Sequence, residues 1–131
     1  MIHIYRQIIN NDEKFRNILR EMNLKYYHKN VSSAEVEDFL DNYSKADLTS
    51  FFDQYLRTTK IPILEYKTKD NTLKFRFKNI VKGFQIPVKV YINGKENWIQ
   101  PNKNWQSFAS KENLISFKVD PNFYLKSSKL K

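Results

Sequence analysis

The 131-residue chain contains no cysteine and only two glycines. Without cysteine it cannot form a disulfide, a thiolate metal site or a cysteine nucleophile. Two glycines are too few for the glycine-rich loops that cradle phosphate groups, and no serine-hydrolase motif occurs. No apolar run is long enough to cross a bilayer, and the first residues lack the apolar core of a signal peptide. Neither a membrane span nor a signal peptide is therefore expected.

Histidine is also scarce, since His3 and His28 are the only two in the chain. Neither belongs to an H-E-x-x-H motif, so we expect no zinc site made by this chain alone. We expect His3, on the apolar face of the first predicted helix, to pack in a core or interface, and His28 to lie in a surface loop. The aspartates do not follow calcium-loop spacing; these are Asp38, Asp41, Asp47 and Asp53. The sequence therefore indicates no catalytic, cofactor-binding or metal-ligating residue.

Positive charge is confined to one part of the chain. Residues 1–60 contain nine basic and nine acidic residues, whereas residues 61–131 contain fourteen basic and five acidic residues and carry the whole net charge of +9. A composition break therefore falls near Lys60. Such an excess is typical of a solvated lysine-rich surface, and also of a surface that meets nucleic acid or an acidic partner.

The first sixty residues have the spacing of amphipathic helices. Ser32-Ser33-Ala34-Glu35 is a capping box, the clearest helix start in the sequence. Asn11 or Asp12 can cap an earlier helix, and Asp47 a later one that Ile61-Pro62 should end, because a residue before proline avoids the α region. The apolar positions at helical spacing are Ile4, Tyr5, Ile8, Ile9, Phe15, Ile18, Leu19, Met22, Val36, Phe39, Leu40, Tyr43, Leu48, Phe51, Phe52 and Tyr55.

From Ile61 onwards the apolar period changes to two, which predicts half-buried strands. Asn93-Gly94 is a strong hairpin signal and Asp70-Asn71 a weaker one. The positions expected to face inward are Leu73, Phe75, Phe77, Val88, Val90, Ile92, Ile115, Phe117 and Val119. The sequence therefore predicts an α+β chain, with a helical segment over 1–60 followed by a small antiparallel β-sandwich over 61–131.

Four stretches of the chain resemble, in the same order, the later part of aminopeptidase N-like zinc metallopeptidases. They are YRQIINNDEKF (Tyr5–Phe15), DLTSFFDQYLR (Asp47–Arg57), IPILEY (Ile61–Tyr66) and FQIPVKV (Phe84–Val90). The second and third are similar to the family passage D-L-x-x-F-F-x-Q-(W/Y)-L…(I/L)-P-x-L, which leads from helices into a β-sandwich. The likeness covers nearly the whole chain.

The resemblance implies a non-catalytic C-terminal fragment of an enzyme that removes residues from peptide N-termini. The family's zinc motif, substrate-amine loop and catalytic tyrosine all lie upstream of the part matched here, so zinc belongs to the intact enzyme and no catalytic residue carries over. Residues 1–60 would end a thermolysin-like catalytic domain and 61–131 would form the sandwich beside it. The residues expected to pack the core or a domain interface are Phe51, Phe52, Tyr55 and Leu56.

Two features of the sequence favour a neighbour outside this chain. The first helix starts at Met1 without a cap, and a β unit of about seventy residues can cover only part of the helical stripes. We therefore expect the missing catalytic domain as a partner, and self-association through exposed helix faces when that domain is absent.

A stand-alone binding module is the alternative function. A basic surface for nucleic acid or an acidic partner would use Lys74, Arg76, Lys78, Lys89 and Lys118. Nucleic acid is the less favoured partner, because alternation puts Phe75 and Phe77 on the face opposite the cations, whereas base stacking needs both together. A carbohydrate- or protein-binding platform would instead use Trp98 and Trp105.

Overall fold

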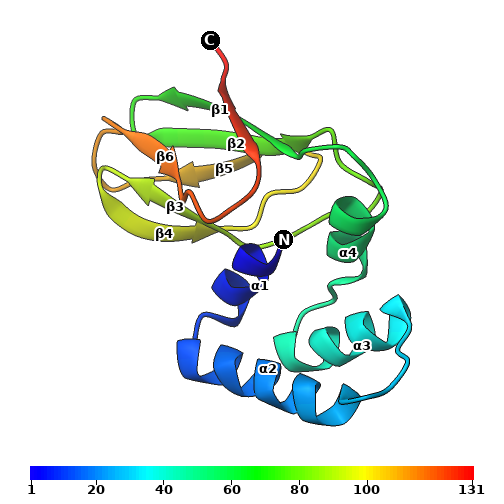
Figure 1. Cartoon of the computed structure of the whole chain (residues 1–131). Coiled ribbons are helices and arrows are strands. Elements are labelled where there is room, and N and C mark those ends of the chain that lie inside the picture. Colours follow the sequence, from blue (N-terminus) through cyan, green and yellow to red (C-terminus); the bar gives the residue numbers. More distant parts are fainter.

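The computed structural model describes residues 1–131, in which four helices precede seven strands (Figure 1). We call residues 1–60 the helical half and residues 61–131 the sheet half. The helices are α1 (Ile2–Ile9), α2 (Asp12–Tyr26), α3 (Ser33–Ser44) and α4 (Thr49–Leu56). None of them is long and apolar enough to cross a membrane. The order of helices and strands agrees with the sequence prediction.

Two helix starts are capped as the sequence predicts. The Asn11 side chain accepts a hydrogen bond from the Lys14 backbone N–H at 2.8 Å, which satisfies a free donor at the start of α2. The capping box at α3 is complete, since Ser32 Oγ accepts from the Glu35 N–H and the Glu35 carboxylate accepts from the Ser32 N–H. Short-range side-chain chemistry therefore fixes both starts.

The last helix differs from the prediction at both ends. Leu48 occupies the N-cap position of α4, and Asp47 instead accepts a hydrogen bond from the Thr49 N–H at 2.9 Å. The helix stops at Leu56, well before Pro62. The Thr58 hydroxyl donates to the Gln54 carbonyl at 2.8 Å, so a side chain takes a place in the hydrogen-bond pattern of the last turn.

The strands form two sheets. One contains four strands in the order β5-β2-β1-β7 and the other three in the order β4-β3-β6. The strands are β1 (Ile63–Lys69), β2 (Thr72–Lys78), β3 (Val88–Ile92), β4 (Lys95–Ile99), β5 (Gln106–Ala109), β6 (Phe117–Val119) and β7 (Lys126–Lys129). The prediction of purely antiparallel pairing is wrong at one place, because β7 pairs with β1 in parallel.

The two predicted turns are present. Asp70 lies between β1 and β2 with a φ of 52°, and Asn93 and Gly94 join β3 to β4 with φ of 50° and 77°. Positive φ at both positions is the geometry of a type I′ turn. The Asn93 side chain also accepts hydrogen bonds from the N–H groups of Ile115 and Ser116.

The prediction that Ile115 faces inward is wrong. Strand β6 begins only at Phe117, and the Ile115 side chain is 89% exposed. The reason is the contact with the turn, because the Ile115 N–H bonds to the Asn93 side chain rather than to a neighbouring strand. The other inward positions of β2 and β3 are buried as predicted.

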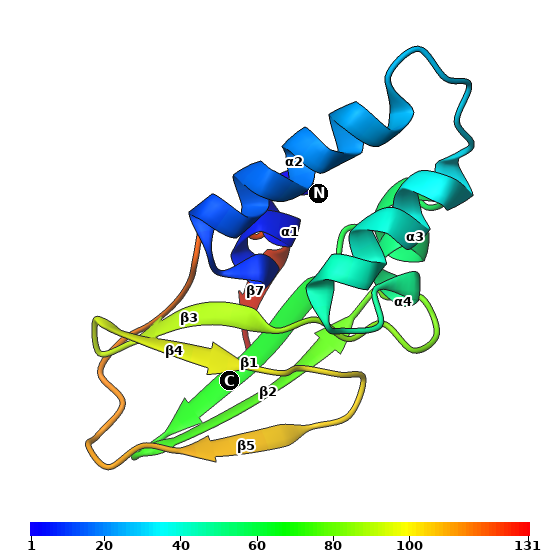
Figure 2. The ribbon, with the colours of Figure 1, turned by 90° about the horizontal axis from the view of Figure 1, so that it is seen from below.

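A single cluster of 19 buried apolar residues joins both halves. In Figures 1 and 2, α1 and α4 lie next to the sheets, and α2 and α3 lie on the side of α1 and α4 that faces away from the sheets. The helices therefore cover one another: the stripe residues Ile4, Tyr5, Ile18, Phe39, Leu40, Phe51 and Phe52 are all buried. The expected large uncovered stripes are absent, and the exposed apolar helix residues are Ile2, Leu24 and Leu56.

Candidate functional site

The passage that resembles the aminopeptidase motif forms the joint between the halves, which we define as residues Phe51–Pro62. Gln54 is fully buried at its centre. Its side-chain nitrogen donates to the Lys60 carbonyl at 2.7 Å, and its side-chain oxygen accepts from the Val81 N–H at 2.7 Å. One amide thus ties α4 to the chain that enters β1 and to the loop that follows β2.

Tyr55 fastens the same helix to the C-terminal part of the chain. Its hydroxyl donates to the Tyr124 carbonyl at 2.8 Å, and its ring packs edge-on against Phe84. Burial raises the pKa of Tyr55 above its ordinary value. Phe51 and Phe52 are buried, as expected for packing residues, whereas Leu56 is half-exposed and is not part of the core.

The two histidines lie apart from any metal-ligating cluster. His28 is exposed, as predicted, and its ring lies 4.1 Å from that of Tyr27. The prediction that His3 packs in a core is wrong within this chain, because its side chain is exposed while its neighbours Ile4 and Tyr5 turn inward. No group of three His, Cys, Asp or Glu side chains that could hold a metal ion is found.

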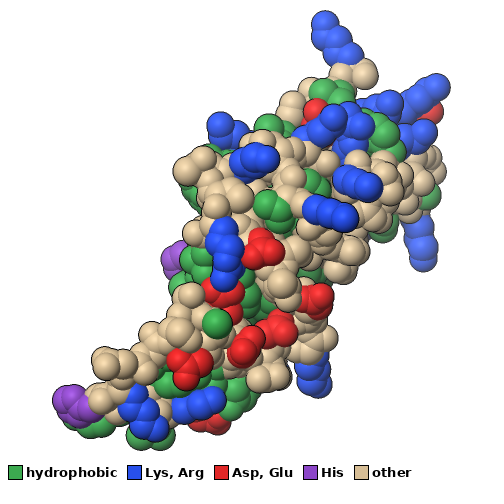
Figure 3. All heavy atoms as spheres, turned by 90° about the vertical axis from the view of Figure 1, so that its right-hand side faces the viewer, with side chains coloured by type: hydrophobic (Ala, Val, Ile, Leu, Met, Phe, Trp, Pro, Cys, Tyr) green, Lys and Arg blue, Asp and Glu red, His purple; other side chains and the backbone are tan.

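The outer side of the four-stranded sheet is basic, and we call it the lysine face; it comprises Lys67, Lys69, Lys74, Arg76, Lys78 and Trp105. Alternation along β2 buries Leu73, Phe75 and Phe77 and turns the cations outward, as predicted. Lys67 and Lys74 stand opposite each other across β1 and β2. Figure 3 shows basic side chains gathered over the sheet half and most of the visible acidic ones over the helical half.

Trp105 brings an aromatic ring to this cationic side. Strand β5 pairs with β2 so that Gln106 lies opposite Phe75, which sets Trp105 beside Arg76. The ring centroid lies 4.5 Å from the Arg76 guanidinium carbon and 5.0 Å from the Lys67 ammonium nitrogen. The alternating pattern of β2 does not predict this arrangement, because Trp105 lies next to β5, which is distant from β2 in the sequence.

Trp98 lies on the other sheet, so the two tryptophans do not form one platform. Its ring centroid is 5.2 Å from the Lys89 ammonium nitrogen and 6.2 Å from that of Phe123. Lys89 in β3 and Lys118 in β6 share this second sheet. The five cations proposed from sequence therefore divide into two groups, one on each sheet.

The acidic partners of the cations also differ between the sheets. Arg76 binds Glu65 at 2.7 Å, whereas Lys67, Lys69 and Lys74 form no salt bridge. On the three-stranded sheet Lys89 lies 3.6 Å from Glu96. Lys78 forms none either, so all four lysines of the lysine face lack a salt bridge.

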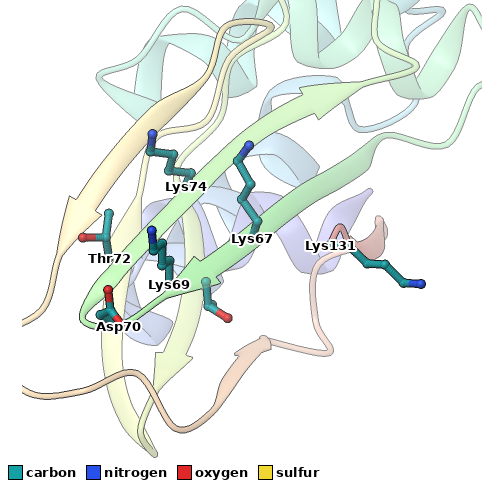
Figure 4. A pocket seen from close by; sticks show the side chains of 7 residues that line it. Lys67, Lys69, Asp70, Thr72, Lys74 and Lys131 are labelled. Carbon is teal, nitrogen blue, oxygen red and sulfur yellow. The ribbon is translucent and has the colours of Figure 1, made fainter.

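A hollow of about 540 Å³ lies at the hairpin end of the lysine face (Figure 4). Its lining residues are Lys67, Thr68, Lys69, Asp70, Thr72, Lys74 and Lys131, with no hydrophobic side chain among them. In Figure 4 the side chains of Lys67, Lys69 and Lys74 extend to the same side of the sheet, while Lys131 points away. Such a surface can attract a negatively charged ligand.

Comparison with known proteins adds no identification. No protein-family model matches this chain, and no curated protein matches it significantly.

Proposed function

We propose that this chain is a non-catalytic packing unit of an aminopeptidase N-like zinc peptidase. In this proposal the helical half completes the α-layer of the catalytic domain, and the sheet half is a small β-sandwich that braces it. The order of the four resembling stretches along the chain supports the assignment. Zinc binding, peptide recognition and hydrolysis are then tasks of the catalytic domain.

Burial of Gln54 is the observation that carries the proposal. An uncharged amide is costly to bury unless its hydrogen bonds are made, and Gln54 makes them to Lys60 within the joint and to Val81 in the loop after β2. Three of its neighbours in the D-L-x-x-F-F-x-Q-(W/Y)-L passage pack against one another in the core, namely Phe51, Phe52 and Tyr55. The motif therefore has the properties of a structural joint that holds helices against a sandwich.

Contacts between the two sheets support the sandwich assignment. The rings of Tyr66 in β1 and Phe117 in β6 lie 4.5 Å apart, and these strands belong to different sheets. Inward-facing residues of both sheets join the same buried cluster, among them Phe77 and Val90. Two sheets that share one core while keeping polar outer sides have the organisation of a sandwich.

Reconstitution tests the packing role. The catalytic domain of an aminopeptidase N-like enzyme, ending just after its catalytic tyrosine, would be mixed with this chain, and complex formation followed by sedimentation. We expect a one-to-one complex that raises the thermal stability of the catalytic domain. The chain alone, incubated with zinc and an aminoacyl-anilide, should give no turnover. Zinc-dependent turnover by the purified chain, or no complex with any such domain, contradicts the proposal.

A matched pair of variants locates the contact. Leu24 in α2 is 77% exposed and is the most exposed large apolar residue of the helical half, so Leu24→Lys should weaken the complex. Ile115→Lys changes an even more exposed apolar residue in the sheet half and should leave the complex unchanged. Equal weakening by both variants would contradict docking through the helices. The same pair, compared without the catalytic domain, reports whether the chain self-associates through α2.

A further inference from the structure

The lysine face combines unpaired cations with an accessible aromatic ring, and we propose that it binds single-stranded nucleic acid. Trp105 stacks with one base, and Lys67, Lys69 and Lys74 contact the phosphates. This inference concerns the outer side of the four-stranded sheet and does not rest on the packing role proposed above.

Charge supplies the first part of the argument. The sheet half carries the whole net charge of +9, and the three lysines form no salt bridge. Lys67 and Lys74 are direct cross-strand neighbours, and like charges so placed repel each other. A phosphate between them relieves that repulsion and releases condensed counterions from the nucleic acid. The surface is therefore arranged to gain from a polyanion.

Trp105 supplies the second part. Its side chain is 38% exposed although its ring contacts both Lys67 and Arg76. The Arg76 guanidinium is itself fixed by Glu65 at 2.7 Å. Contacts with the sheet therefore hold the indole in place while part of it stays accessible. A base can stack on such a surface without ordering a mobile side chain first.

The combination selects single strands over other polyanions. Bases in a duplex are already stacked on one another and are not available to an indole ring. An acidic polypeptide would use the lysines but has no nucleobase for Trp105. A sulfated polysaccharide would offer the indole only sugar rings, so heparin is the competing ligand in the test below. The hollow at the hairpin end of the lysine face has no hydrophobic lining residue, unlike the centre of a protein–protein contact. Single-stranded nucleic acid uses both the cations and the ring.

Anisotropy of a fluorescein-labelled oligothymidylate, titrated with the full chain, measures the binding. Repeating the titration at several salt concentrations gives the number of phosphate contacts. Three contacts predict a slope of log K against log salt of about −2 for a single strand. A DNA duplex of the same length should bind more weakly at equal salt.

Two tryptophan variants test the stacking contact. Trp105→Ala should weaken oligothymidylate binding by about tenfold, which is within the range for one lost base stack. Trp98→Ala is the matched control, because Trp98 is 37% exposed and also lies over a lysine, but on the other sheet. It should leave the affinity unchanged. Trp105→Phe retains an aromatic ring and should retain most of the affinity.

Lysine variants keep the test decisive if Trp105→Ala does not fold. Lys67→Ala/Lys74→Ala removes two cations of the lysine face and should make the salt slope shallower by about 1.4. Lys89→Ala/Lys118→Ala removes two cations of the other sheet and should leave the slope unchanged. Equal effects of the two pairs overturn the proposal. So does equal affinity for heparin or for an abasic oligomer, since neither carries a base for Trp105.

Discussion

The helical half and the sheet half differ in charge but share one core. The helical half has equal numbers of acidic and basic residues, whereas the sheet half carries all of the net charge of +9. Eight of the nineteen buried apolar residues belong to the helical half and eleven to the sheet half. The composition break near Lys60 is therefore a break in surface chemistry and not in the hydrophobic core.

The residues that hold the two halves together are therefore different from the surface residues that are available for binding. Apolar contacts and the Gln54 amide cross the break and join the halves. The lysine face lies on one side of it, on a sheet surface that faces away from the core. A substitution in the core of either half should therefore lower the stability of both halves. Anion binding should change only with substitutions in the lysine face.

The largest expected effect is that of Phe51→Ala in the joint. Phe51 is fully buried and packs against Phe52 and Tyr55, so truncation should lower the free energy of unfolding by about 3–5 kcal/mol. Circular dichroism reports the helices and tryptophan fluorescence reports the sheet half, since both tryptophans lie there. The two signals should shift together. Tyr27→Ala, which removes an exposed ring, serves as the control and should stay near wild type.

Separate unfolding transitions of the two halves in the Phe51→Ala variant would contradict a shared core. If the helical signal were lost while tryptophan fluorescence stayed native, the halves would be independent folding units. The single buried cluster would then not act as one cooperative core.

The next effect in size is that of Gln54→Ala. The substitution leaves the Val81 N–H and the Lys60 carbonyl without their partner, so stability should fall by about 2 kcal/mol. Gln100→Ala changes an exposed glutamine and is the matched control. Denaturant unfolding, followed with the same two signals, measures both variants. A Gln54→Ala variant as stable as Gln100→Ala would show that the buried amide does not tie the halves together.

Local features of the fold could be predicted from sequence, and long-range ones could not. The capping box at Ser32 and the turn at Asn93-Gly94 depend on residues that lie within a few positions of one another, and both were predicted correctly. The parallel pairing of β7 with β1 joins segments about sixty residues apart. No periodicity encodes that choice, because an edge strand can pair in either direction and still bury its apolar side.

The candidate sites show the same division. Alternation along β2 predicted which side chains face outward, but the contact of Trp105 with Arg76 depends on how β5 adds to the sheet. Gln54 lies in a passage that resembles a family motif, yet its bonds to Lys60 and Val81 require the folded joint. The core alternative for His3 is wrong because helical spacing gives a face without saying how much of that face is covered within the chain.

A smaller effect is expected from Tyr5→Phe, which tests the helical half through its pH dependence. The Tyr5 hydroxyl donates to the Leu40 carbonyl at 2.9 Å, so its loss should cost about 1 kcal/mol at neutral pH. Burial, with smaller contributions from Asp41 and Tyr43, raises the pKa of Tyr5 to about 12 from an ordinary value of 10.

The sign of the Tyr5 effect follows from that shift. The folded protein keeps the phenol proton at a pH where the unfolded chain has released it, so the stabilisation is complete below pH 10 and is lost between about pH 10 and 12. Urea unfolding at pH 8 to 11.5 should show a steeper alkaline loss for wild type than for Tyr5→Phe. Parallel curves would contradict the raised pKa.

The smallest expected effects come from one local device in each half. Ser32→Ala removes the capping hydroxyl of α3 and should cost about 0.5–1 kcal/mol. The pKa of Glu35 should rise at the same time, because hydrogen bonds from the Ser32 backbone and hydroxyl hold it below its ordinary value. Carboxyl chemical shifts against pH measure that change, and thermal unfolding measures the stability.

Gly94→Ala is the counterpart in the sheet half. Apart from Gly94 itself and its two chain neighbours, no heavy atom lies within 4 Å of the added methyl group, so its cost is the backbone strain at a φ of 77°, about 1 kcal/mol. If the two halves form one cooperative unit, each substitution should lower the helical and tryptophan transitions equally, although Ser32 and Gly94 belong to different halves. A loss confined to the signal of the substituted half would locate a weak boundary at the joint.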